Sequence, residues 1–127
     1  MSNLFKRIFN NIKWAFQRMF RGWDDRAAND IAGWLSDTLP DMIEYMINNL
    51  WTYPTDGFID PAVGVPTDEE DIANMEKWKQ ILQDIADGFR EFSFENLCRE
   101  YVEEDYKMEK FHKGMELFVK YFGELWN

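Results

Sequence analysis

The sequence predicts an all-α fold, a single-domain bundle of about four helices with a long Pro/Gly-containing central loop. Apolar residues recur every three or four positions in four stretches, and no stretch alternates as a strand does. Prolines and glycines gather in one segment between the second and third stretches. At 127 residues, with 46% hydrophobic content, the chain has the size and composition of one domain. We therefore expect one helical domain over residues 1–127.

Residues 1–20 are predicted to form a basic amphipathic helix. Its apolar positions follow helical spacing: Leu4, Phe5, Ile8, Phe9, Ile12, Ala15, Phe16, Met19 and Phe20. Gly22 is expected to end this helix, and Asp24 or Asp25 to cap the next one. That second helix is expected over residues 24–50, kinked or broken near Pro40 because proline removes a backbone hydrogen bond.

Residues 51–68 are predicted to be a loop, because they contain three prolines and two glycines. A third helix is expected over residues 69–91, where Thr67 and Glu70 match a capping box. A fourth is expected over residues 94–126, capped by Ser93. Its apolar residues step by three and four from Phe94 to Leu125, as in a heptad pattern, and Glu104 is the single misfit.

Charge is divided unevenly along the chain. The net charge is −10, from 14 Lys and Arg against 24 Asp and Glu. Residues 1–26 hold six basic and two acidic residues, a net charge of +4, and the remainder carries −14. So acidic a body is repelled by nucleic-acid phosphates, and we expect no direct nucleic-acid contact. The single cysteine, Cys98, excludes an internal disulfide and is typical of a reducing compartment.

No chemistry of an enzyme is predicted. The only histidine stands in one E-x-x-H unit, Glu109 and His112, whereas a di-iron bundle needs two such units. Cys98 lacks a local nucleophile signature and is interpreted as a small core residue. The spacing of Asp56 and Asp60 does not fit a calcium loop. We expect no metal site, no cofactor and no catalytic residue.

Two surfaces have alternative interpretations. The apolar face of residues 1–20 is interpreted as part of the bundle core, since the other three helices alone would leave much apolar surface bare. The less favoured alternative is that this face binds a membrane surface.

The acidic residues of the last helix are either a solvated face or a row that binds a basic partner. The candidate partner-binding residues are Glu100, Glu103, Glu104, Asp105 and Glu109, with Trp51, Tyr53 and Phe58 as aromatic anchors in the loop.

Four stretches carry a resemblance to known proteins: "RGWDDRAANDIAGWLSDTLPDMI", "NNLWTYPTD", "EKWKQILQDIADGF" and "KGMELFVKYFGELWN". In their order, these stretches resemble a recurring class of small uncharacterised proteins of tailed bacteriophages and prophages. The resemblance implies a phage-encoded protein in the host bacterial cytoplasm. It supplies no catalytic residues, and implies that the protein binds host machinery.

The sequence thus predicts a non-catalytic bacteriophage accessory protein that binds and modulates a host protein, as an acidic anti-defence (anti-CRISPR-like) inhibitor would. The expected partner is a host bacterial protein with a basic surface, and a homodimer remains open. The alternative is a structural, virion-associated or peripheral membrane phage protein that uses its basic N-terminal helix.

Overall fold

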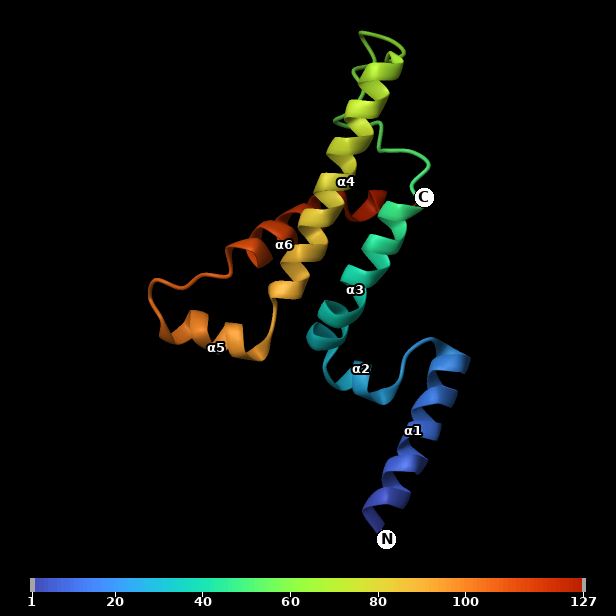
Figure 1. Cartoon of the computed structure of the whole chain (residues 1–127), viewed down its shortest axis with the longest axis vertical. Helices are drawn as coiled ribbons and strands as arrows, with labels where there is room; N and C mark the ends of the chain where they lie inside the picture. Colours follow the sequence, from blue (N-terminus) through green and yellow to red (C-terminus); the bar gives the residue numbers. More distant parts are fainter. Residues whose placement is uncertain (1, 127) are drawn as a thin grey trace. The chain divides into compact units, whose positions relative to one another are not determined.

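The computed structural model describes residues 2–126 and is all-helical, which confirms the predicted fold class. Within these residues there is no strand, and there are six α-helices rather than about four (Figure 1). They are α1 Ser2–Arg21, α2 Asp25–Asn29, α3 Ile31–Asn48, α4 Asp68–Glu91, α5 Phe94–Val102 and α6 Glu109–Tyr121, with a final 3-10 helix, η1, at Phe122–Glu124. The chain divides into two compact units, one up to Leu35 and one from Ser36 onward, with the boundary inside α3.

The second predicted helix breaks at Asp30 and not near Pro40. The Asp30 backbone N–H donates to the Arg26 carbonyl at the end of α2, 3.1 Å, and its side chain accepts from the Gly33 N–H, 2.9 Å. Asp30 therefore ends one helix and caps the next. Pro40 lies inside α3 without interrupting it, and its ring is buried. The burial of the ring offsets the missing backbone hydrogen bond.

The last predicted helix, residues 94–126, is two helices joined by a connector. The Glu103 N–H donates to the Arg99 carbonyl, 2.8 Å, which ends α5, and α6 begins at Glu109. Met108 in the connector is only 1% exposed. The apolar pattern in the sequence therefore continues across the break, because Met108 packs in the core although it lies in the connector.

The predicted helix ends are confirmed where a specific residue was expected to make them. Gly22, with φ of 82°, follows α1, and its N–H donates to the Arg18 carbonyl, 2.9 Å. Asp24, Thr67 and Ser93 cap α2, α4 and α5, each accepting a backbone N–H three residues on.

The core of the second unit lies between α4 and α6, the pair of helices with the most extensive contact. From α4 it receives Trp78, Leu82, Ile85, Ala86 and Phe89. The ring of Phe89 packs edge-on against Phe111 and Phe118, with centroids 6.0 and 5.2 Å apart, and Trp78 packs against Tyr121 at 5.3 Å. Aromatic edge contacts thus align the two helices.

Two glycines allow α4 and α6 to approach closely. A Cβ on Gly88 would lie 2.5 Å from the Lys110 carbonyl oxygen and 2.9 Å from the Gly114 Cα. A Cβ on Gly114 would lie 3.0 Å from the Gly88 Cα. The two backbones are in contact here, so neither position has room for a side chain.

Polar contacts join α3 to α4. Arg90 of α4 forms ion pairs with Glu44 and with Asp41 of α3, the latter at 3.1 Å. Gln83 also donates to Glu44, 3.3 Å. The Arg90 guanidinium holds the pKa of Glu44 below its usual value.

Candidate interaction surfaces

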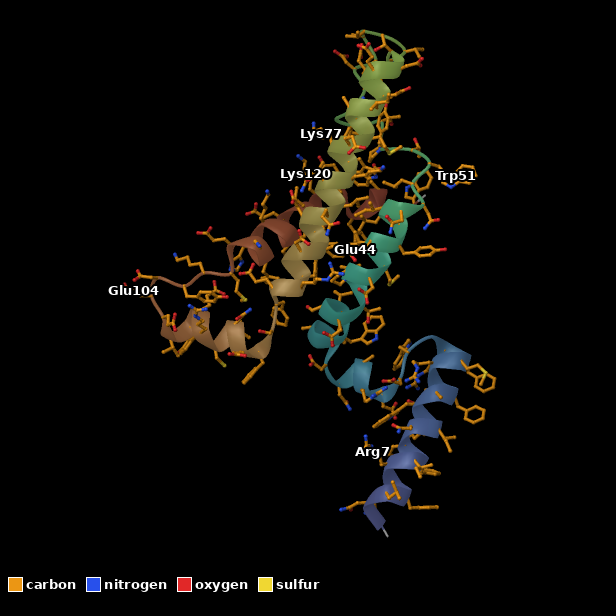
Figure 2. All side chains as sticks on the ribbon, in the orientation of Figure 1. Arg7, Glu44, Trp51, Lys77, Glu104 and Lys120 are labelled. Atoms are coloured by element: carbon orange, nitrogen blue, oxygen red, sulfur yellow. The ribbon has the colours of Figure 1, made fainter. Side chains whose placement is uncertain are left out.

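The predicted acidic row does not lie on one helix face. Glu100 is in α5 and pairs with His112 of α6, 2.8 Å, and Glu103 pairs with Arg99, 3.0 Å. The exposed Glu104 and Asp105 follow in the connector, and Glu109 begins α6. Figure 2 shows Glu104 projecting from that connector. The break at Val102 therefore turns a predicted row into an acidic cluster around the end of α5.

An exposed apolar stripe runs along α5. We call it the α5 stripe, and its residues are Phe94, Leu97, Cys98, Tyr101 and Val102. All five are exposed, Tyr101 at 93%. The other side of α5 is bound to the molecule, because the Asn96 amide donates to the Glu91 carbonyl, 2.7 Å, and Glu100 pairs with His112. The helix therefore turns its apolar side to solvent, and Cys98 is not the core residue that was expected.

The three predicted anchors in the loop between α3 and α4 have different surroundings. Trp51 is 87% exposed and points away from the ribbon in Figure 2. Phe58 is half-buried between Tyr53 and Trp78, with centroids 5.7 and 6.1 Å away. The Tyr53 hydroxyl donates to Asp71. Trp51 is the most exposed of the three, and the other two hold the loop on α4.

An open pocket of about 420 Å³ lies beside these loop aromatics. It is lined by Trp51, Thr52, Tyr53, Thr55, Ile59, Val65, Pro66, Asp71 and Met75. Its wall is mixed, with the polar side chains of Thr52, Thr55 and Asp71 beside apolar ones.

The joint between α1 and α2 is an ionic cluster centred on two aspartates. Asp24 is buried and accepts hydrogen bonds from Arg26, 2.9 Å, and Arg18, 2.8 Å, besides its cap bond to the Ala27 N–H, 3.2 Å. The bond from Arg26 and then that from Arg18 hold the pKa of Asp24 well below its usual range, against the opposing effect of burial.

Asp25 completes this cluster from the other side. It accepts from Gln17, 2.9 Å, and Arg21, 2.7 Å, and pairs with Lys13, 3.3 Å. These three contacts, with that of Gln17 the strongest, lower the pKa of Asp25 from 3.8 to about 2. The Arg26 guanidinium also lies over the Trp14 ring, 4.1 Å from its centroid. All of these contacts use the polar side of α1.

The opposite side of α1 is exposed along its whole length. We call it the α1 apolar face, and its residues are Leu4, Phe5, Ile8, Phe9, Ile12, Ala15, Phe16, Met19 and Phe20. Phe9, near the middle of the helix, is 59% exposed. Within the first unit this face does not form the predicted core contact, because the ionic joint binds the polar side of α1 instead.

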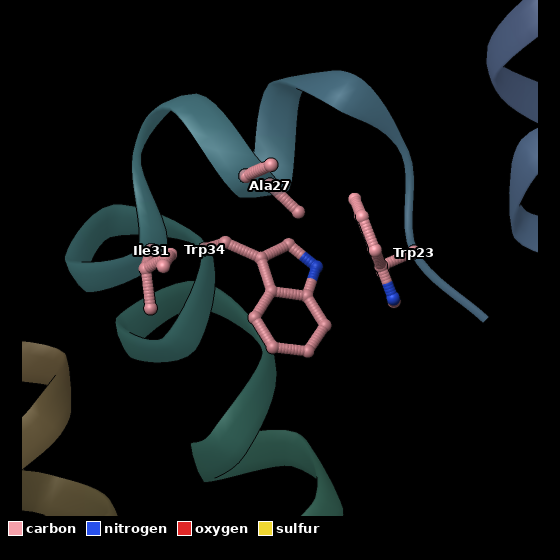
Figure 3. A pocket seen from close by; sticks show the side chains of 5 residues that line it. Trp23, Ala27, Ile31 and Trp34 are labelled. Carbon is pink, nitrogen blue, oxygen red and sulfur yellow. The ribbon is translucent and has the colours of Figure 1, made fainter. Parts of the chain in front are cut away.

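A second pocket, of about 290 Å³, lies within the first unit. It is lined by Trp23, Ala27, Ala28, Ile31 and Trp34, all apolar (Figure 3). The two indole rings face the same open space in Figure 3. The sequence analysis did not pair Trp23 with Trp34, because their approach depends on the break between α2 and α3 at Asp30.

The described residues contain no group of three or more His, Cys, Asp or Glu side chains placed to hold a metal. His112 bonds to Glu100, and not to Glu109 of its own E-x-x-H unit. None of the helices in residues 2–126 combines the length and the apolar composition that crossing a bilayer would require.

Sequence reasoning missed the α5 stripe because the heptad spacing of residues 94–126 suggested one continuous buried seam. The signal that could have revealed it is the acidic run Glu103–Asp105, which interrupts that spacing.

Searches against protein-family models, curated proteins and solved structures each found no match to this chain.

Proposed function

We propose that the protein is a non-catalytic accessory protein that binds a host protein through the α5 stripe and the acidic cluster beside it. The observation that carries the proposal is the orientation of α5, with its polar side bonded to the molecule and its apolar stripe in solvent. An exposed contiguous apolar surface rimmed by charge is typical of a protein-binding site.

The charge around the stripe selects the kind of partner. Glu95, Glu103, Glu104 and Asp105 surround α5, and the only basic residue in that helix, Arg99, is already paired with Glu103. A basic segment with its own apolar residues would match both the stripe and its acidic border. The second unit as a whole holds eight Lys and Arg against twenty-one Asp and Glu, which steers such partners toward it.

The phage setting is a narrower part of the proposal. It rests on the sequence resemblance, which makes a host defence or nucleic-acid-handling protein the expected target and the host cytoplasm the expected place. Such host proteins carry basic grooves for nucleic acid, and an acidic binding protein of this charge would compete for them.

Removing the apolar anchor tests the proposal. Tyr101→Ser is expected to weaken binding of the host partner about 30-fold, because a central aromatic anchor contributes about 2 kcal/mol. The fold should be unaffected, since Tyr101 is almost fully exposed. The partner is first captured from host lysate and identified by mass spectrometry, and its affinity is then measured by calorimetry. Val119→Ser, at another exposed position, is the control.

Charge reversal gives an independent arm of this experiment. Glu103→Lys with Glu104→Lys should weaken the same partner and reduce the salt dependence of its affinity. Asp37→Lys with Asp56→Lys, at exposed positions away from α5, gives the same charge change and should retain most of the affinity. A partner whose affinity is the same for the α5 variants and the controls would remove α5 from the binding site.

A further inference from the structure

We propose that the α1 apolar face binds the surface of an anionic lipid bilayer, with α1 lying flat in the headgroup region. This surface is separate from the α5 stripe, and the inference does not depend on the proposed host partner. It starts from the ionic joint at Asp24 and Asp25, which occupies the polar side of α1.

The apolar face of α1 is wide and unbroken. At about 100° per residue, its nine apolar residues fall within an arc of about 160° to which residues 3–21 contribute no polar side chain. Four of the nine are phenylalanines, and every one is exposed. Such a helix, polar on the other side, matches those that lie in the plane of a membrane interface.

Basic residues border the apolar arc on both sides. By the same geometry, Lys6 and Lys13 lie along one edge, and Arg7 and Arg18 along the other. A long basic side chain at such an edge reaches lipid phosphates, where it is not already ion-paired, while its stem lies against the acyl region. Residues 2–21 contain no Asp or Glu, so nothing on the helix opposes an anionic surface.

The same charge argues against a second copy as the occupant. Pairing two α1 helices through their apolar faces would bring the basic edges of both together, with no acidic residue in either helix to compensate. Lys6 and Arg7, near the start of α1, lie outside the ionic joint that engages Lys13, Arg18 and Arg21. These two cations are therefore the ones we assign to lipid phosphates.

Vesicle flotation with the full chain tests the proposal. We expect the protein to float with phosphatidylcholine vesicles that contain phosphatidylglycerol, and to be released by high salt, because the attraction is partly electrostatic. Vesicles of phosphatidylcholine alone should retain much less. Equal flotation with both vesicles, or none with the anionic ones, would overturn the proposal.

Two pairs of variants locate the binding surface. Phe9→Ser with Ile12→Ser should reduce the partition coefficient roughly tenfold or more, since both side chains would enter the interface. The control, Ile72→Ser with Val119→Ser, removes exposed apolar residues outside α1. Lys6→Gln with Arg7→Gln should reduce partitioning roughly 30-fold, given about fivefold per basic residue. Its control is Lys107→Gln with Lys110→Gln.

The other occupants of this face give distinct results. If a second copy covers it, light scattering will show a dimer that the Phe9→Ser, Ile12→Ser variant dissociates. If another part of the chain covers it, the same variant will lower the melting temperature. Either result together with unchanged flotation would refute the bilayer as the occupant.

Discussion

Asp24 and Asp25 determine which side of α1 faces its own unit. Each accepts hydrogen bonds from side chains of the polar face, Arg18 to Asp24, and Gln17 and Arg21 to Asp25. The sequence predicted one of these aspartates as a helix cap, which is confirmed for Asp24. It did not predict that both would bond back to the preceding helix, because spacing along a chain does not give the direction of a turn.

The ionic joint should weaken only in acid. The pKa of Asp25 is lowered from 3.8 to about 2, so its stabilising effect is complete above about pH 4 and is lost as the pH falls toward 2. We expect the difference in melting temperature between the wild type and Asp25→Asn to shrink over this range. Calorimetric scans at a series of pH values measure it. A difference that stays constant from pH 5 to about pH 2 would contradict the assignment.

At the scale of helices, the sequence did not predict the close contact between α4 and α6. The predicted α4 was almost the observed one, since capping signals at Thr67 are local. The contact between Gly88 and Gly114 joins positions distant in sequence, and neither glycine stands out in its own stretch. How closely two helices pack depends on the side chains of both, so the apolar spacing within one helix cannot predict the distance between them.

Filling that contact should destabilise the second unit. Gly88→Ala or Gly114→Ala should each lower the free energy of unfolding by about 1–3 kcal/mol, because the added methyl forces two backbones apart. Gly123→Ala is the matched control, since a Cβ there meets nothing within 4 Å. Urea unfolding followed by tryptophan fluorescence measures all three. Equal stability of Gly88→Ala and Gly123→Ala would show that the backbones are not in contact.

At the scale of the whole molecule, charge is distributed by unit. Residues up to 35 hold six basic and three acidic residues, and the remainder has a net charge of −13. The sequence predicted a similar separation of charge, with the change at residue 26, because charge needs no knowledge of folding. The sequence also predicted the all-α class, because helical spacing is a local property that can be seen in each stretch by itself. The outward orientation of the α1 apolar face and the α5 stripe was not predictable, because amphipathic spacing does not say which side is covered.

Salt should stabilise the acidic unit. Its excess of like charges repels itself in the folded state, and ions screen that repulsion. Raising sodium chloride from a low concentration to about 0.5 M should therefore raise the melting temperature reported by Trp78 and the other core aromatics. Sucrose at matched osmolality is the control. A melting temperature that falls with salt would mean that the ion pairs of Arg90 with Asp41 and Glu44 outweigh the repulsion.

The position of Cys98 gives the molecule a natural attachment point for a reporter. It is the only cysteine in the chain, it is exposed, and it lies within the α5 stripe. The emission of a fluorophore coupled to its thiol would change when a partner covers the stripe and excludes water. No cysteine has to be introduced for this measurement. The same thiol can link two molecules under air, so samples for affinity work need a reducing agent.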